Sequence, residues 1–278
     1  MSDYSTEHIT RVLSGISLVR RLEYRPTVGS TNDIAKQLGA EGAPEATLVI
    51  ADKQTAGRGR LGRAWWTPPG AALAFSLLLR PAVLPARASR LTMLAGLAAA
   101  EAVEHVTGLQ VGLKWPNDVV IEQAASRRRP APALGKLGGI LCETSISGQD
   151  MEFAVVGLGL NVNVDFGGRD DLPEATSLMI ELGHTVDRLD LLFVLVECFA
   201  DRYPVMERDD QLRADWSARL VTLGRQVVAR RRGDSVAGLA ERVDEFGALL
   251  IRQDDGTLAR VDAADVTWRS SRPSRCNP

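Results

Sequence analysis

The sequence contains few of the residues that form disulfides or bind metal ions in small proteins: it has three cysteines and three histidines in 278 residues. Cys142, Cys198 and Cys276 form no CxxC pair, and an odd number of cysteines does not suggest a disulfide framework. The scattered histidines argue against a zinc site. A chain of this length buries a core that needs neither disulfides nor a structural metal.

A strong excess of one charge and a long apolar run are also missing. Lysine and arginine number 33 against 35 acidic residues, a formal charge of −2. Dedicated nucleic-acid and membrane-surface proteins need a one-sided positive field, so we expect no DNA and no membrane among the partners. Apolar stretches such as residues 71–79 are shorter than the roughly 20 residues that span a bilayer. Residues 1–15 lack the apolar core of a signal peptide, and we therefore expect a cytoplasmic protein.

The order of apolar and polar segments predicts two domains. In residues 1–220 we expect a catalytic α+β domain with strands and helices, and from about Leu223 the segments become short strands with a hairpin signal, DDG. Residues 221–270 therefore predict a small β-barrel, and residues 271–278 a disordered tail. The expected strands of the larger domain are 21–28, 46–55, 71–81, 136–146 and 151–163, and residues 111–122 are expected to form a strand, a Pro-Asn-Asp turn and a second strand. Its expected helices are 7–19, 30–40, 86–107, 187–203 and 208–219.

Two short motifs imitate nucleotide-binding signatures. Gly57, Gly59 and Gly62 satisfy GxGxxG, but the continuation RAWWTPPG stops the helix that a dinucleotide-binding turn requires. Residues 165–167 spell DFG, but neither an HRD triad nor a VAIK lysine accompanies them. Both matches are interpreted as coincidence.

Four separated segments place polar groups beside apolar strands. They are Ser30-Thr31-Asn32, Gln54 with the following GRGRLGR, KWPND at 114–118, and KLGGI at 136–140. Each has a plain structural reading when taken alone, namely a helix N-cap, a surface arginine loop, a turn and a bulge. Glycines that alternate with arginines instead favour a clamp for phosphate or carboxylate oxygens.

Together, QTAGRGR, KWPND and KLGGIL resemble the motifs of the biotin protein ligases, over roughly residues 29–163 and more weakly through the C-terminal segment. The resemblance implies a class II synthetase-like mixed sheet flanked by helices, with an SH3-like C-terminal β-barrel. It also implies a two-step reaction: the biotin carboxylate attacks the α-phosphate of ATP, giving biotinyl-5′-AMP and pyrophosphate. A lysine of a biotin carboxyl carrier domain of a carboxylase then attacks the adenylate, and AMP leaves.

The resemblance carries site residues with it. It implies that Lys136, Arg60 and Asp118 are catalytic, and that Asp118 positions Mg²⁺ or the incoming lysine amine. A neutral ureido ring with two donors and one acceptor suits side chains that both donate and accept. The implied biotin-binding residues are Ser30, Thr31, Asn32, Gln54, Arg58, Gly59, Arg60, Lys136, Gly138 and Gly139. The implied ATP-binding residues are Arg58, Arg60, Arg63, Trp65, Asn117 and Asn161.

Alternatives remain open at this stage. A lipoate-type protein ligase shares the scaffold, and a nucleotide-binding module without catalysis would release no pyrophosphate. A biotin-responsive transcription regulator needs a helix-turn-helix, for which we expect no room in the 29 residues before Ser30.

The 123–135 loop is longer than expected of the family, and its arginines at 127–129 form either a solvated face or a contact to an acidic carrier domain. Leu61 replaces a basic residue of many relatives, and a homodimer stays open.

Overall fold

The structure is a computed structural model that describes residues 4–123, 133–206, 210–231 and 233–269. The predicted tail at 271–278 and the arginines at 127–129 lie outside the described residues. Within these ranges, no helix has the length and apolar character needed to cross a bilayer.

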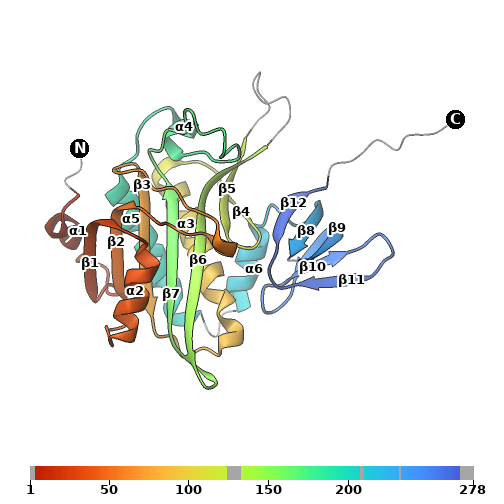
Figure 1. Cartoon of the computed structure of the whole chain (residues 1–278), viewed down its shortest axis with the longest axis horizontal. Coiled ribbons are helices and arrows are strands. Elements are labelled where there is room, and N and C mark those ends of the chain that lie inside the picture. Colours follow the sequence, from red (N-terminus) through yellow and green to blue (C-terminus); the bar gives the residue numbers. More distant parts are fainter. Residues whose placement is uncertain (1–3, 124–132, 207–209, 232, 270–278) are drawn as a thin grey trace.

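A mixed seven-stranded sheet forms the centre of the larger domain (Figure 1), in the order β1-β2-β3-β7-β6-β5-β4. Only β1 and β2 run parallel, and the other neighbours are antiparallel. The prediction of a mixed sheet is confirmed. Its strands are β1 (Arg21–Val28), β2 (Thr47–Gln54), β3 (Ala72–Leu79), β4 (Gly112–Lys114), β5 (Asp118–Gln123), β6 (Ala133–Ser147) and β7 (Asp150–Asn161).

Helices cover both faces of this sheet, as the alternation of side chains along the strands requires. On β2, Val49 packs toward α2 (Thr31–Ala40), whereas Leu48 and Ile50 join the larger core under α3 (Ser89–Thr107) and α5 (Arg188–Arg202). The shorter helices are α1 (Thr6–Leu13), α4 (Leu178–Leu182) and α6 (Asp210–Ala218). The face that carries α2 is the one on which the site described below lies.

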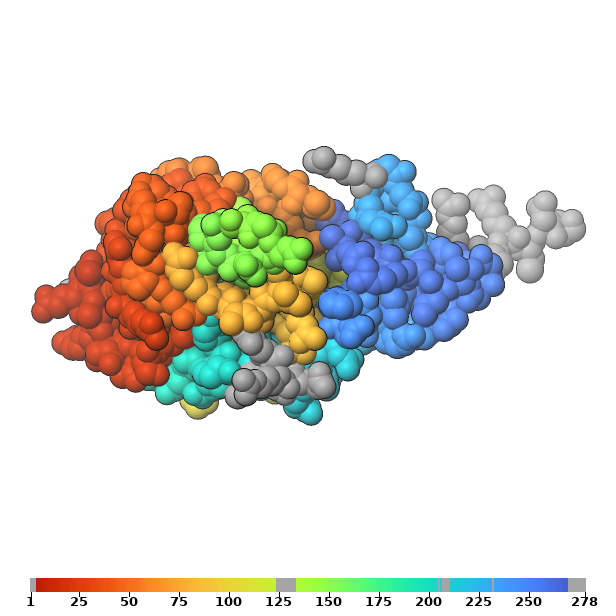
Figure 2. Space-filling model, turned by 90° about the horizontal axis from the view of Figure 1, so that it is seen from below, coloured from red at the N-terminus to blue at the C-terminus, as the bar shows by residue number. Residues whose placement is uncertain are grey.

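A separate five-stranded antiparallel sheet forms the C-terminal domain, in the order β11-β10-β9-β8-β12. Its strands are β8 (Gln226–Arg231), β9 (Asp234–Val243), β10 (Leu249–Arg252), β11 (Leu258–Val261) and β12 (Asp265–Trp268). Figure 2 shows this domain (blue) packed against the main domain beside α3. Buried Trp115 fastens the two, because its indole Nε1 donates to the Gly247 carbonyl oxygen at 2.9 Å.

Two helices begin differently. Asp187 caps α5, since its carboxylate accepts from the backbone N–H groups of Leu189 and Asp190. Ser30 occupies the N-cap position of α2, but its side chain makes no capping bond, so the helix N-cap reading of Ser30 holds for its position only. The hydroxyl of Ser30 therefore does not serve to begin the helix.

Candidate active site

A cleft of about 460 Å³ opens on the α2 face of the sheet. It lies between the start of α2, the segment 57–66 (hereafter the arginine loop), strands β5 to β7, the 165–175 loop and β12. All but one of the predicted site residues line it, and Gly138 is the exception. The predicted residues that line the cleft are Ser30, Thr31, Asn32, Gln54, Arg58, Gly59, Arg60, Arg63, Trp65, Asn117, Asp118, Lys136, Gly139 and Asn161.

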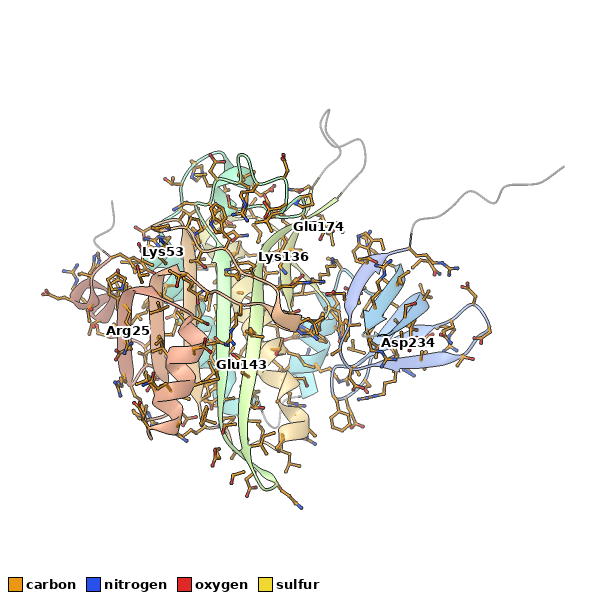
Figure 3. All side chains as sticks on the ribbon, in the orientation of Figure 1. Arg25, Lys53, Lys136, Glu143, Glu174 and Asp234 are labelled. Atoms are coloured by element: carbon orange, nitrogen blue, oxygen red, sulfur yellow. The ribbon has the colours of Figure 1, made fainter. Side chains whose placement is uncertain are left out.

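Sheet register explains why segments far apart in sequence meet here. Asp118 pairs with Gly139, and Gly139 pairs with Gly159, so these three residues share the α2 face. A β-bulge between β5 and β6 shifts the register at Leu137 and brings Lys136 to the same region (Figure 3). Lys136 Nζ then lies 2.6 Å from Asp118 Oδ1.

A chain of hydrogen bonds orders the polar groups at the start of α2. Gln54 Oε1 accepts from the backbone N–H of Thr31 at 2.8 Å and lies 3.1 Å from the Thr31 hydroxyl oxygen. The buried Ser76 hydroxyl lies 2.8 Å from Thr31 Oγ1 and 2.6 Å from Asn32 Oδ1. Asn32 Nδ2 donates to the Leu141 carbonyl oxygen and to a Glu143 carboxylate. These groups are fixed before any ligand arrives.

Glycines form the floor of the cleft where side chains could not fit. A Cβ at Gly157 would lie 2.0 Å from Asn32 Oδ1, and a Cβ at Gly159 would lie 2.4 Å from Trp65 Nε1. A Cβ at Gly138 would instead meet the Gly159 carbonyl oxygen at 2.7 Å. Gly138 therefore permits the close approach of β6 and β7, whereas Gly139, Gly157 and Gly159 face the cleft.

The arginine loop folds as a tight hairpin over the cleft. The Gly59 N–H donates to the Arg63 carbonyl oxygen at 2.7 Å, and the Trp65 N–H donates to the Gly57 carbonyl oxygen at 2.8 Å. A 3₁₀ turn at Arg60–Gly62 forms the tip of this hairpin. Leu61 stands at the tip with a φ of 57° and is 62% exposed, so it offers its side chain to solvent.

Two arginines of this loop have different partners. Arg60 donates to Asn117 Oδ1 at 3.2 Å, and burial lowers the pKa of its guanidinium even though the carboxylates of Asp118 and Asp265 oppose that shift. Arg63 pairs with Asp265 of β12 and is mostly exposed. The C-terminal domain thus supplies part of the cleft wall and a partner for the loop.

Sequence reasoning missed the 165–175 loop and β12 as walls of the cleft. Phe166 packs on Trp66 with ring centroids 5.8 Å apart, and the Arg169 guanidinium lies 4.4 Å from the Trp66 centroid. Asn161, predicted near adenine, donates from Nδ2 to the Thr176 carbonyl oxygen at 3.0 Å and so fixes the end of this loop. Only the DFG letters at 165–167 pointed to the segment, and they pointed to the wrong chemistry.

The described side chains contain no group of three or more His, Cys, Asp or Glu residues that could hold a metal ion. Among the residues that the structure describes, Asp118 is the cleft carboxylate that pairs with Lys136. A divalent ion here would therefore need ligands from a substrate as well as from the chain, which is how Mg²⁺ is commonly held beside phosphates.

The fold and the cleft define a ligase of the biotin and lipoate class. The model of the "Biotin/lipoate A/B protein ligase family" matches residues 24–161, and the "Biotin protein ligase C terminal domain" model matches residues 222–268. The second model is one of biotin protein ligases, so this match favours a biotin ligase over a lipoate ligase. The chain belongs to the biotin protein ligase family.

Relatives support this assignment over most of the chain. The biotin–[acetyl-CoA-carboxylase] ligase of Paracoccus denitrificans is 35% identical, with 85% of this chain and 96% of the relative aligned. The corresponding ligase of Mycobacterium tuberculosis is also 35% identical, over 89% of this chain and 88% of the relative. The bifunctional ligase/repressor BirA of Bacillus subtilis is 32% identical, over 89% of this chain and 74% of the relative.

Among solved structures, the biotin protein ligase of Aquifex aeolicus in complex with biotin and ATP is similar in fold. The TM-score is 0.72 at 26% identity, over 91% of this chain and all of that one. The expectations of a biotin protein ligase, of its fold class and of its enzymatic activity are confirmed. The roles of individual site residues and the domain boundary at 220 stay predictions.

Proposed function

We propose that the cleft on the α2 face is where this chain joins biotin to ATP and then passes biotin to a carrier lysine. The observation that carries the proposal is the convergence of four distant segments on one cleft: the start of α2, the arginine loop, the start of β5 and the start of β6. One end of that cleft is neutral and ordered by hydrogen bonds, and the other is lined by cations.

The ordered end is proposed to bind the ureido ring. Ser30, Thr31 and Gln54 offer hydroxyl and amide groups that both donate and accept, as a neutral ring with two N–H donors and one carbonyl requires. Both donors of Asn32 are already engaged by the chain, so Asn32 can offer biotin only its carbonyl oxygen. Gly139, Gly157 and Gly159 let the alkyl chain of biotin lie close to the sheet.

The cationic end is proposed to hold the reacting carboxylate and phosphate. In the first step a biotin carboxylate oxygen forms a bond to the α-phosphorus of ATP, and the bond to pyrophosphate breaks. Lys136 and Arg60 would offset the repulsion between the two anions and stabilise charge that develops on the phosphoryl oxygens. Arg58, Gly59 and Arg63 would extend this clamp along the arginine loop.

In the second step the carrier lysine amine attacks the acyl carbon of the adenylate and forms an amide, the nitrogen gives up a proton, and AMP leaves with the electrons of the broken bond. Asp118 lies beside Lys136 and is proposed to orient that amine. Trp65, Asn117 and Asn161 are proposed to bound the nucleotide pocket. With every reactant held in one cleft, catalysis is attributed to proximity and electrostatics.

Mg²⁺ fits this site only in company with the nucleotide. Asp118 would supply one carboxylate ligand, and the ATP phosphates would supply further ligands. The bound ion would neutralise charge on the leaving pyrophosphate. The partner is proposed to be the biotin carboxyl carrier domain of a carboxylase, with no DNA and no membrane. A cytoplasmic location and a homodimer also stay predictions.

The test is a comparison of biotin with lipoate in ATP–pyrophosphate exchange by the purified chain. Biotin-dependent exchange, followed by transfer to a carrier domain, is the expected result. Exchange that depends on lipoate instead would favour the lipoate-ligase alternative. ATP binding without exchange would favour a nucleotide-binding module.

A further inference from the structure

Glu143 is an acidic residue of the site region that neither the reaction nor the sequence motifs assign. It lies on β6, seven positions beyond Lys136 and on the α2 face, where it pairs across the sheet with Val155 (Figure 3). Its side chain is 28% exposed, so its charge is partly removed from water. A half-buried carboxylate is costly unless it is well paired.

The partners of Glu143 come from two other segments of the site. Oε2 accepts from Asn32 Nδ2 at 2.8 Å, and Oε1 accepts from Lys36 Nζ at 2.8 Å, both on α2. Arg58 NH2, at the start of the arginine loop, lies 3.6 Å from Oε2. Asp33 also pairs with both cations, so two acids and two bases alternate around the start of α2.

These contacts outweigh the cost of burial. Burial by itself would raise the pKa of Glu143, but the hydrogen bonds from Lys36 and Asn32 lower it below the ordinary value. The carboxylate is therefore charged at neutral pH. A charged acceptor fixes the direction of the Asn32 amide, because only the Nδ2 side can donate to it.

The direction of that amide reaches the proposed ring-binding groups. With Nδ2 held toward Glu143 and the Leu141 carbonyl, Oδ1 must face the Ser76 hydroxyl, 2.6 Å away. Ser76 in turn lies 2.8 Å from Thr31 Oγ1. Because the single Ser76 proton goes to Asn32 Oδ1, Ser76 Oγ can only accept the proton of the Thr31 hydroxyl, and Gln54 Oε1 keeps the Thr31 backbone N–H as its donor. The orientation set at Glu143 thus fixes the direction in which the Thr31 hydroxyl donates.

We propose that Glu143 is a positioning residue for biotin: its carboxylate orients Asn32 and so preforms the ring-binding end of the cleft. The inference rests on the proposed placement of the ureido ring beside Ser30, Thr31 and Gln54. It assigns no contact between Glu143 and the reacting atoms. Loss of the carboxylate should therefore weaken biotin binding and leave the chemical step nearly unchanged.

The test uses two variants. Glu143→Leu removes every polar contact of this side chain, whereas Glu143→Gln can still accept a hydrogen bond from Asn32 but carries no charge. We expect the KM for biotin to rise about tenfold in Glu143→Leu and about threefold in Glu143→Gln, with kcat and the KM for ATP within about twofold. Lys36→Met removes one cation but leaves the Asn32 bond, and should change the biotin KM less than either. Glu152→Gln, on β7 with Ser145 as its partner at 2.8 Å, is the matched control for loss of a sheet carboxylate.

A merely structural role would lower the melting temperature and the amount of active enzyme but leave the biotin KM alone, and that result would overturn the proposal. So would a parallel rise of the KM for ATP in both Glu143 variants. Gln54→Ala separates this inference from the placement on which it rests. If Gln54→Ala weakens biotin binding and Glu143→Leu does not, only the role of Glu143 is refuted. If Gln54→Ala has no effect on biotin binding, both the placement of the ureido ring and the role of Glu143 are refuted.

Discussion

Gly157→Ala is a substitution for which the structure predicts a large effect from a single methyl group. The new Cβ would lie 2.0 Å from Asn32 Oδ1 and 2.8 Å from Asn32 Cγ, so the buried asparagine must move. Asn32 makes hydrogen bonds to the Leu141 carbonyl, to Ser76 and to the Glu143 carboxylate. At about 1 kcal/mol for a neutral bond and about 1.5–3 kcal/mol for one to a charged group, their loss should cost roughly 3–5 kcal/mol.

Thermal unfolding of the purified variant measures this cost. For a chain of this size about 1 kcal/mol lowers the melting temperature by roughly 2–4 °C, so a fall of about 10 °C is expected. Gly15→Ala is the matched control, because a Cβ there meets nothing within 4 Å, and its melting temperature should stay within a few degrees. Equal melting temperatures for the two variants would refute the reasoning.

A double-mutant cycle identifies Asn32 as the group that the methyl displaces. Asn32→Ala removes the obstructing side chain, so Gly157→Ala should cost less than about 0.5 kcal/mol in that background. Full additivity of the two substitutions would mean that the cost arises elsewhere in β7. The biotin KM should rise in each single variant, since both disturb the same hydrogen-bonded chain.

Two further predictions concern the C-terminal side of the molecule and the acid limit of stability. Asp265→Asn should raise the KM for ATP a few-fold, because it releases Arg63 of the arginine loop. The free energy of unfolding in urea should fall by less than about 0.5 kcal/mol, because the ion pair is exposed. An unchanged KM for ATP would argue against a role for the Arg63–Asp265 pair. Burial would raise the pKa of Glu104, but hydrogen bonds from Arg219 and the Val111 N–H lower it. Its carboxylate therefore stabilises the fold above its unfolded pKa, and that contribution is lost as pH falls through the lower folded pKa. Glu104→Gln should cost about 1 kcal/mol at pH 7 and progressively less as the pH falls below the unfolded pKa of the carboxyl, and a pH-independent cost would contradict this assignment.

Local patterns in the sequence were sufficient for the strands and for most of the site. Continuous or alternating apolar runs predicted the central strands at 46–55, 71–81 and 151–163, and each appears in the sheet with ends shifted by a few residues. The first helix is shorter than expected, ending at Leu13 rather than at residue 19. The site motifs converge because antiparallel register brings Asp118, Gly139 and Gly159 into one row, which no single motif specifies.

Contacts between residues far apart in the chain could not be predicted from the sequence. Arg63 and Asp265 are 202 positions apart, and nothing near either residue indicates the other. The place of Gly138 is a similar case: it pairs with Leu160 on β7, and a Cβ there would meet the Gly159 carbonyl oxygen at 2.7 Å, a contact between strands that KLGGI alone does not indicate. Ser30 reads as a helix cap in any local window, and only the tertiary structure shows that its side chain is spared for the cleft.

The central claim is that Lys136 neutralises charge at the point where biotin and ATP react. Biotin-dependent ATP–pyrophosphate exchange by Lys136→Ala tests it most directly, with Lys53→Ala as the control because Lys53 is an exposed lysine on β2 outside the cleft. Exchange should fall about 100-fold or more in Lys136→Ala, as when one preorganised donor to a developing anion is removed, and stay near the unmodified rate in the control. A folded Lys136→Ala variant that exchanges pyrophosphate as fast as the unmodified chain would contradict the claim.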